Sequence, residues 1–520
     1  MNGYTILWAD DEIDLLKPHI LFLQQKGYII VPINNGFEAV ELSASRNFDI
    51  IFLDENMPGM SGLEALDLIK STKPNVPVVM ITKHEEEQIM DDAIGAQIED
   101  YLIKPLNHKQ ILLAVKKILD KKHLVMEKVT STYQQEFSKI NMAILDNLSH
   151  EEWADIYKKI VHWELKINQS DAGMLEVLGA QKEEANLNFC RFIKRNYESW
   201  LNDPNSSKPL MSHKLMKAKV FPEVNKSRPT FMFVIDNFRF DQWKIIESEL
   251  LDYFAVDSEE TYYSILPTTT AYSRNSLFSG MLPSEMYRVY PELWVSEEED
   301  DGKNNFEHEF LEKQLQRNNL KHKFSYNKIL KFEEGRIFSN HLSNLFSNDL
   351  NVIVFNFVDM LSHARSDMNM IMELTPDEAA YRSITKSWFA HSSLFEILKK
   401  ISEIKARVII TTDHGTIRVK RPFKIIGDRN VNTNLRYKQG RNLNYSGDKI
   451  LATSKPERFF LPKGNVSTSY VFAIEDQFFA YPNNFNQYVS MYKDTFQHGG
   501  VSLEEMIIPL VFLTPKNVLN

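Results

Sequence analysis

Short apolar segments alternate with helix-like patterns over the first 120 residues of the chain. Five of them have the length and composition of strands: Tyr4–Ala9, Tyr28–Ile33, Asp49–Leu53, Val76–Ile81 and Asp100–Ile103. Alternation of strands with helices is typical of a doubly wound parallel sheet. We therefore expect an α/β domain over residues 1–120.

A purely helical pattern follows, over residues 121–205. Helix formers carry apolar residues at helical spacing, as at Met142, Ile144, Leu145 and Leu148, and proline is absent until Pro204. This predicts a small bundle of three or more helices. A helix-turn-helix DNA reader is one interpretation, but acidic stretches disfavour it. A spacer or dimerisation element is favoured, and no direct DNA binding is expected.

The stretch Asn202–Lys226 is rich in Asn, Ser, Pro and Lys and is predicted to be a linker. A third domain, residues 206–520, then returns to apolar strands separated by helical patterns. Its strongest strand candidates are the runs TFMFVID, VIVFNFVD, RVIITTDHG and MIIPLVFL. Continuous apolar runs of this kind are typical of strands that are buried on both faces of a parallel sheet.

Composition narrows the class of protein. The chain has 520 residues, is 43% hydrophobic and has a net charge of −10, which argues against a protein that coats nucleic acid but allows a local basic groove. The single cysteine excludes an internal disulfide and a thiolate metal site. We see no signal peptide and no apolar run near 18 residues, so a cytoplasmic protein is expected.

Polar side chains follow four strands of the first domain: Asp10, Asp11, Asp54, Thr82 and Lys104. The carboxyl ends of parallel strands meet at one edge of a sheet, so these side chains should converge. Three clustered aspartates are tolerable around a hard cation such as Mg²⁺. Asp54 could then attack a phosphoryl donor, with Lys104 balancing the phosphoryl charge and Thr82 donating a hydrogen bond to it.

The motifs WADDE, FLDENMPGMSG, VVMITKH and YLIKP resemble the receiver domain of two-component response regulators. The resemblance implies that Asp54 is the phospho-acceptor, and it implies a cis bond before Pro105. It also implies a Mg²⁺ site formed by Asp10, Asp11, Asp54 and Asn56. Asp11, Asp54 and the backbone carbonyl of Asn56 would bind the ion, and Asp10 would lie behind these ligands. The switch residues would be Thr82, Tyr101 and Lys104.

Three strands of the third domain end at or near an aspartate, with three histidines close by: Asp236, Asp359, His363, Asp413, His414 and His498. Carboxylate oxygens and imidazole nitrogens are ligands that Zn²⁺ accepts. Asp413 and His414 are neighbours, which a strand would point to opposite faces. A turn opening at Gly415 could bring both onto one ion.

A threonine run, PTTT, stands directly before a predicted helix at Thr268–Thr270. Such a hydroxyl could act as a nucleophile beside the helix N-terminal amides, where a phosphate binds well. An ordinary helix N-cap is the simpler interpretation.

Taken together, these stretches resemble the alkaline phosphatase superfamily, and within it the PglZ branch, over most of Lys226–Asn520. PTTTAY followed by SLFSG resembles the nucleophile segment of superfamily phosphodiesterases, which implies that Thr270 attacks. The resemblance implies two Zn²⁺ ions, with Mn²⁺ as an alternative metal. One ion would be held by Asp359, His363 and His498. The other would be held by four residues: Asp236, Thr270, Asp413 and His414. Two such ions, roughly 4 Å apart, can stabilise the attacking and leaving oxygens of a phosphoryl displacement.

An insertion, Arg418–Lys463, carries twelve basic and three acidic residues, with aromatic residues between them. This mixture suits an oligonucleotide, because cations bind phosphates and aromatic rings stack on bases. Arg418, Lys420 and Arg421 are therefore candidate substrate-binding residues. An exposed loop with scattered charge is the alternative.

The order of the three domains resembles the PorX family of response regulators. The expected fold is thus α/β: a receiver-type doubly wound parallel sheet, a helical bundle linker domain and an alkaline-phosphatase-like α/β domain. The resemblance implies a sensor histidine kinase, dimerisation on phosphorylation, and association with an extracytoplasmic-function sigma factor and with the cytoplasmic part of the type IX secretion machinery. It also implies phosphodiesterase activity on small cyclic or linear oligonucleotides.

Two other functions stay open. The chain could be a regulator that acts through protein contacts, with a structural metal site, or it could be a phosphomonoesterase. A candidate nucleophile at Thr270 favours an enzyme, since a structural site has no use for one.

Overall fold

The structure, a computed structural model, describes residues 4–83, 98–167, 172–224, 227–295, 302–356, 375–427, 432–445, 449–465, 467–483 and 485–516, with only the backbone described at residues 120–131 and 172. The chain divides into two compact units, Met1–Gln135 and Glu136–Asn520. Each unit is described by itself.

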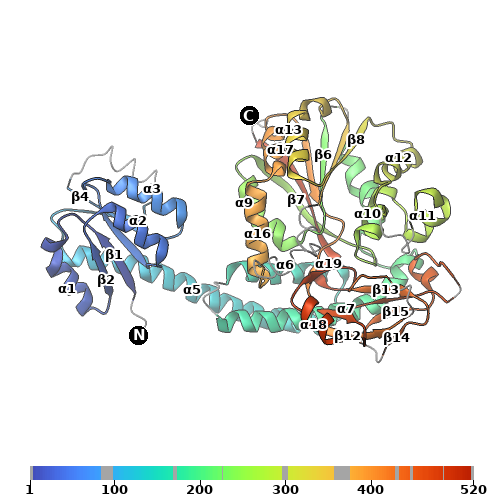
Figure 1. Cartoon of the computed structure of the whole chain (residues 1–520), viewed down its shortest axis with the longest axis horizontal. Coiled ribbons are helices and arrows are strands. Elements are labelled where there is room, and N and C mark those ends of the chain that lie inside the picture. Colours follow the sequence, from blue (N-terminus) through green and yellow to red (C-terminus); the bar gives the residue numbers. More distant parts are fainter. Residues whose placement is uncertain are drawn as a thin grey trace. The chain divides into compact units, whose positions relative to one another are not determined.

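The first unit is built on a five-stranded parallel sheet with the strand order β2-β1-β3-β4-β5 (Figure 1). The strands are β1 (Thr5–Ala9), β2 (Ile29–Ile33), β3 (Ile50–Asp54), β4 (Val78–Thr82) and β5 (Asp100–Ile103). All five predicted strands are present, each within two residues of its expected ends. The doubly wound parallel sheet is therefore confirmed.

Helices cover both faces of this sheet: α1 (Lys17–Gln25), α2 (Gly36–Ser45), α3 (Gly62–Thr72) and α5 (His108–Ile144). One apolar layer joins Trp8 and Phe52 to Ile20 of α1 and Val115 of α5. The other joins their strand neighbours, including Leu7 and Leu53, to α2 and α3. Adjacent residues enter opposite layers because side chains alternate along a strand.

The second unit contains a six-stranded sheet with the order β7-β19-β10-β6-β9-β8. Its strands are β6 (Thr230–Ile235), β7 (Phe254–Tyr263), β8 (Phe324–Ile329), β9 (Leu350–Phe355), β10 (Arg407–Thr411) and β19 (Ile507–Pro515). The strands β10, β6, β9 and β8 run parallel, whereas β19 and β7 complete the sheet in antiparallel pairs. The central strands β6 and β10 are buried on both faces, which explains their unbroken apolar sequences.

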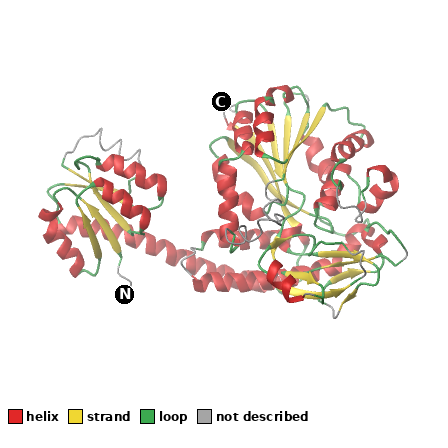
Figure 2. Ribbon diagram, in the orientation of Figure 1, coloured by secondary structure: helices red, strands yellow, loops and turns green. Residues whose placement is uncertain are grey.

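Helices lie on both sides of the large sheet (Figure 2). On one side α10 (Thr270–Ser279), α11 (Pro283–Val289) and α12 (Glu307–Arg317) pack against Met232, Val234 and Ile409. The other side carries α9 (Phe240–Leu250), α13 (Phe332–Asn340), α16 (Glu378–Ala390) and α17 (Ser393–Ser402). The strands that carry the predicted site thus lie between two layers of helices.

The predicted helices of the middle segment are α6 (His150–Lys166) and α7 (Ala172–Asn202), which follow the long α5. They pack onto the large sheet domain. The Tyr263 hydroxyl donates to the His150 carbonyl at 2.7 Å, and the Tyr197 hydroxyl accepts from the Leu266 amide at 2.8 Å. The division into compact units falls inside α5, so α6 and α7 share a unit with the sheet.

The linker predicted at Asn202–Lys226 is wrong for much of its length. Leu215, Met216, Val220 and Phe221 are buried in the core of the large sheet domain, around the short helix α8 (Ser212–Leu215). The polar residues that suggested a linker alternate with apolar residues spaced about one helical turn apart. Composition averages over this spacing and hides it.

Two small sheets extend the second unit. One has the order β14-β12-β17 and the other β13-β16-β15. Their strands are β12 (Arg421–Ile426), β13 (Tyr437–Gly440), β14 (Asn444–Tyr445), β15 (Leu451–Thr453), β16 (Ser469–Phe472) and β17 (Gln477–Ala480). A two-stranded ribbon pairs β11 (Ile417–Arg418) with β18 (Phe496–Gln497), and the helices α18 (Phe485–Tyr492) and α19 (Leu503–Met506) lie nearby in sequence. Among the described residues, no helix combines the length and apolarity needed to cross a bilayer.

Candidate active site

The first unit gathers its predicted residues at one edge of the sheet. Asp10 and Asp54 are 0% and 2% exposed. The Lys104 ammonium lies 2.8 Å from Asp10 Oδ2 and 2.7 Å from Asp54 Oδ1, so it bridges the two carboxylates. Thr82 is buried at the end of β4, and Tyr101 on β5 is 40% exposed. The peptide bond before Pro105 is cis, as the receiver resemblance implies.

The Lys104 bridge shapes the titration of this site. Burial raises the pKa of the Asp54 carboxyl, and the hydrogen bond from Lys104 opposes that shift, while the Asp10 charge adds to it. Burial works against the charge on Lys104, but the hydrogen bonds to Asp10 and Asp54 outweigh it and raise the Lys104 pKa. The lysine therefore stays charged beside the candidate phospho-acceptor.

Among the described residues of this unit, Asp10, Asp11 and Glu12 form a group that could hold a metal ion. One carboxylate oxygen from each lies within 4.8 Å of the others. Asp54 is not among these three residues, and it shares the Lys104 ammonium with Asp10. The backbone N–H of Asn56 donates to Asp54 Oδ2 at 3.2 Å. Glu12 is a candidate that the sequence reasoning missed, although it is the third acid of the run that follows β1. It also forms an ion pair with Lys83 at 2.9 Å.

The second unit brings together residues that follow two neighbouring strands. Asp236 follows β6, Asp413 and His414 follow β10, and these strands are parallel partners with Val234 opposite Thr411. One ligand atom from each of the three residues lies within 4.8 Å of the others, and all three side chains are 0% exposed. Two carboxylates and an imidazole, buried together, are a donor set that fits Zn²⁺ or Mn²⁺.

The backbone of the loop after β10 passes very close to the backbone of α19 at Gly415. A Cβ atom there would meet the Glu504 carbonyl oxygen at 2.0 Å. Only glycine permits this close approach of backbone to backbone. The glycine thus allows the turn that carries Asp413 and His414 to one cluster.

Thr270 is the first residue of α10, and its hydroxyl faces the cluster. Its Oγ1 lies 3.3 Å from Asp236 Oδ1 and 3.1 Å from His414 Nε2. Thr269 is the residue before the helix, and the Thr268 hydroxyl donates instead to the Gly500 carbonyl at 2.9 Å. Of the threonine run, Thr270 is the member beside the candidate ligands.

His498 lies next to this cluster on a distant loop. Its ring stacks on His414 with a centroid distance of 4.3 Å, and its Nδ1 lies 3.2 Å from the Thr268 carbonyl oxygen. The two residues predicted to share a zinc ion with it, Asp359 and His363, lie outside the described residues. The second predicted ion therefore stays a prediction.

A buried arginine that the sequence reasoning missed reaches the same carboxylates. Arg274 Nη1 lies 2.7 Å from Asp236 Oδ2 and 3.9 Å from Asp413 Oδ2, and Arg274 Nε lies 2.5 Å from Glu307 Oε1. Burial disfavours the charge on Arg274, but these carboxylates raise its pKa well above the ordinary value. The only sequence signal is its place one helical turn after Thr270, on the same face of α10.

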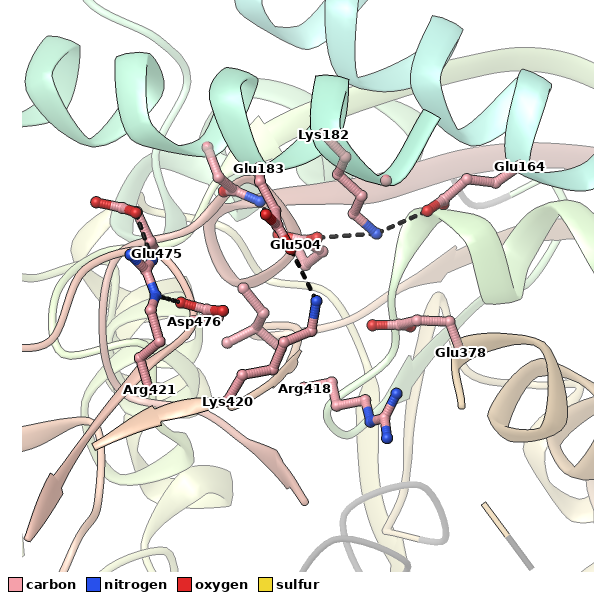
Figure 3. A pocket seen from close by; sticks show the side chains of 13 residues that line it. Glu164, Lys182, Glu183, Glu378, Arg418, Lys420, Arg421, Glu475, Asp476 and Glu504 are labelled. Carbon is pink, nitrogen blue, oxygen red and sulfur yellow. Dashed lines mark hydrogen bonds and ion pairs between the residues drawn. The ribbon is translucent and has the colours of Figure 1, made fainter. Parts of the chain in front are cut away.

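The predicted substrate-binding residues Arg418, Lys420 and Arg421 each have an acidic partner in the structure. Arg418 pairs with Asp494 at 3.2 Å, Lys420 pairs with Glu183 at 2.9 Å, and Arg421 pairs with both Glu475 and Asp476. All three line a cavity of about 150 Å³ (Figure 3), where they meet more acidic than basic side chains. A charge count along the sequence cannot see these partners.

Several aromatic residues of the insertion are packed inside the domain. Tyr437 and Phe459 are 3% and 6% exposed, and Phe423 packs against the small core around Ile425 and Phe479. Rings buried in this way cannot stack on bases. Tyr445 is 36% exposed and keeps an accessible ring.

Three family descriptions match consecutive parts of the chain. Residues 6–116 match the response regulator receiver domain, residues 123–201 match the PorX response regulator linker domain, and residues 215–513 match the BREX system PglZ alkaline phosphatase-like domain. Together they give the PorX architecture, as the sequence predicted.

Curated relatives match over shorter stretches. The chain is 33% identical over 118 residues to the transcriptional regulatory protein ResD of Bacillus subtilis, covering 23% of the chain and 49% of ResD. It is 26% identical over 161 residues to a cyclic di-GMP phosphodiesterase of Thermotoga maritima, covering 28% of the chain and 43% of that protein. The chain thus spans about half or less of the length of these two relatives.

Among solved structures, a CheY-like receiver domain protein from Methanospirillum hungatei is 23% identical, with a TM-score of 0.23, over 24% of this chain and 98% of that one. CheY from Borrelia burgdorferi, in a complex with CheX, beryllofluoride and Mg²⁺, is 28% identical, with a TM-score of 0.22, over 22% of this chain and 89% of that one. The PglZ match covers more than half of the chain, and the receiver and linker matches precede it. The chain therefore belongs to the PglZ alkaline phosphatase-like family and carries that domain behind a receiver and a PorX-type linker.

Proposed function

We propose that the protein is a response regulator in which phosphorylation of Asp54 controls dimerisation and a zinc-dependent phosphodiesterase that acts on small cyclic or linear oligonucleotides. One observation carries the enzymatic part. The Thr270 hydroxyl stands at the head of a helix, beside Asp236 and His414, in a buried cluster that also contains Asp413.

Asp236, Asp413 and His414 would hold one zinc ion beside Thr270, and His498 would hold a second with Asp359 and His363. Bound zinc would supply Lewis acidity and lower the pKa of a neighbouring hydroxyl. Thr270 is the first residue of α10, where backbone amides and the helix dipole favour a phosphate anion. In the proposed step Thr270 Oγ1 would attack phosphorus and form a P–O bond while the bond from phosphorus to one ester oxygen breaks and that alcohol leaves. Before the attack, the hydroxyl would be oriented by its hydrogen bond to Asp236 Oδ1, 3.3 Å away.

In the receiver, Asp10, Asp11 and Asp54 would form the Mg²⁺ site with the Asn56 carbonyl, and Glu12 is an additional candidate. A sensor histidine kinase would supply the phosphoryl group to Asp54. The proposal includes association with an extracytoplasmic-function sigma factor and with the cytoplasmic part of the type IX secretion machinery, so the protein would work in the cytoplasm. These partners rest on the domain order alone.

A second candidate function is regulation through protein contacts, with a structural or weakly active metal site. Arg274 favours it, because this buried cation already compensates Asp236 and Asp413 and would compete with a metal ion for the same carboxylates. The Thr270 hydroxyl favours the enzyme. Metal content and turnover distinguish the two.

The test compares the purified full chain with its Thr270→Ala variant. We expect about two zinc ions per chain by elemental analysis and faster hydrolysis of a chromogenic phosphodiester than of the corresponding monoester. Thr270→Ala should keep its zinc and lose on the order of 10³-fold or more in turnover, since the attacking oxygen is gone.

Thr261→Ala, at a partly exposed position on β7, is the matched control and should behave as the wild type. Less than one zinc per chain would contradict the metal site. Full turnover by Thr270→Ala would place the nucleophile elsewhere.

A further inference from the structure

The loop between β18 and α19, residues 498–502, carries the candidate ligand His498 and is held by its backbone. Gly499 N donates to Thr268 Oγ1 at 3.0 Å, and Thr268 Oγ1 donates to the Gly500 carbonyl at 2.9 Å. Gly499 has a φ of 121°, and a Cβ at Gly500 would meet the Ala473 carbonyl oxygen at 2.4 Å. The place of His498 beside His414 therefore depends on where this loop is fixed.

The C-terminal end of the loop is fixed by α7. Asn186 Oδ1 accepts a hydrogen bond from the Leu503 amide at 2.8 Å, and Asn186 Nδ2 donates to Glu504 Oε2 at 3.0 Å. Lys182 Nζ lies 3.0 Å from Glu504 Oε1 and 2.9 Å from Glu164 Oε1 of α6 (Figure 3). Cys190 Sγ lies 3.2 Å from the Val501 carbonyl oxygen.

These three α7 residues are four positions apart, so they form one stripe along the helix. The contacts are shielded from water, since Asn186, Cys190 and Glu504 are 5%, 3% and 2% exposed. A buried polar group that loses its partner is costly, so the loop and α7 hold each other in one arrangement. The stripe faces the loop of the candidate metal site.

We infer that α7 positions His498: through Lys182 and Asn186, the linker helix holds Leu503 and Glu504 and thereby sets the geometry of the metal site. The inference rests on the proposed function and deepens it, because it assigns regulation of that site to the linker. Lys182 and Asn186 are positioning residues, since among the described residues their contacts reach the site through Leu503 and Glu504. Any change in α7 that separates it from α19 would loosen His498.

The test uses the full chain with Asn186→Leu, a change of similar volume that removes both hydrogen bonds. We expect zinc affinity, measured by competition with a chromogenic chelator, to fall roughly tenfold, as for other residues that orient metal ligands. kcat for a chromogenic diester should fall by a similar factor with KM unchanged, and excess zinc should restore part of it.

Asn188→Leu is the matched control. Asn188 lies on the same helix, is only partly buried, and donates to the Glu184 carbonyl of α7 itself. It should leave zinc affinity and turnover at wild-type values. Lys182→Met is the second variant, because the Lys182 side chain borders the cavity of Figure 3 and its replacement can be accommodated there.

Should Asn186→Leu fail to fold, Lys182→Met decides, with the same expected loss of zinc affinity. Wild-type zinc affinity in the folded variants would overturn the inference, and so would a loss of thermal stability with no change in zinc affinity. A wild-type chain that neither binds zinc nor hydrolyses the diester would overturn the proposed function instead, which keeps the two failures apart.

Discussion

Lys438 is a buried cation inside the insertion of the second unit. It is 1% exposed, donates to the Asn432 carbonyl at 2.8 Å and lies 4.9 Å from the centre of the Tyr481 ring. Burial lowers its pKa to about 7. A residue that the charge count included among the cations is thus substantially deprotonated near physiological pH.

This shift predicts a pH-dependent stability. The unfolded lysine has a pKa of about 10.4, so between about pH 7 and 10 the unfolded chain holds a proton that the folded chain has released. Stability should therefore rise with pH in this window, by up to about 1.4 kcal/mol per unit from this residue. Lys438→Met should remove that slope and stabilise the unit at pH 7.

Denaturant-induced unfolding at pH 7, 8 and 9, followed by circular dichroism, measures the effect as a difference between variant and wild type. Lys449→Met, at an exposed lysine of the same insertion, is the control and should keep the wild-type slope. Equal slopes for wild type and Lys438→Met would contradict the buried-lysine interpretation.

At the scale of elements, the candidate site depends on how closely the loop after β10 approaches α19. The Gly415 amide donates to the Glu505 carbonyl at 3.2 Å, and a side chain at Gly415 would meet the Glu504 carbonyl oxygen at 2.0 Å and Arg239 Cγ at 3.3 Å. The backbone carbonyl cannot rotate away as the end of a flexible side chain could. The turn and α19 must separate to admit a methyl group.

We expect Gly415→Ala to destabilise the second unit by about 1–3 kcal/mol, the range for overpacking a closed core. It should also displace His414 and weaken zinc binding. Thermal unfolding and zinc titration measure the two effects. Gly464→Ala is the control, because a Cβ there meets nothing within 4 Å, and it should change stability by less than about 0.5 kcal/mol. Unchanged zinc binding in Gly415→Ala would show that the turn tolerates the separation.

At the scale of the whole molecule, the proposed phospho-acceptor Asp54 and the candidate hydrolase site belong to different compact units. We therefore expect phosphorylation to act on the candidate hydrolase site through a change in conformation or in association. A coupling of about 1–3 kcal/mol would shift a monomer–dimer balance 5- to 150-fold. The linker helices α6 and α7, which share a unit with the hydrolase, are the natural carriers of such a change.

Beryllofluoride with Mg²⁺, a stable mimic of the phosphoryl group, should therefore convert the chain toward a dimer and raise diesterase activity modestly. Asp54→Ala should abolish both effects. Light scattering alongside steady-state hydrolysis, with and without the mimic, measures them. Dimerisation without any change in activity would separate the enzyme from the switch and favour regulation through protein contacts.

The sequence by itself predicted the five strands of the first unit and their parallel arrangement, four strands of the large sheet (β6, β9, β10 and β19) and the polar residues at several strand ends. These features are local: a strand buried on both faces needs a continuous apolar run, and parallel strands bring their carboxyl ends to one edge. The approach of Asp236, Asp413 and His414 could therefore be anticipated from two short stretches.

Only the tertiary structure decided which charges meet. Several contacts join segments that are far apart in the chain. They are the ion pairs of Arg418, Lys420 and Arg421, the approach of Arg274 to Asp236 and Asp413, and the contacts of α7 with residues 503 and 504. Arg274 and Thr270, by contrast, are neighbours on α10. The burial of Leu215, Met216, Val220 and Phe221 was likewise decided by the sheet they cover. Sequence periodicity reports which side of an element faces inward, but an ion pair depends on which distant element that side meets, and electrostatic partners are set by distance in space.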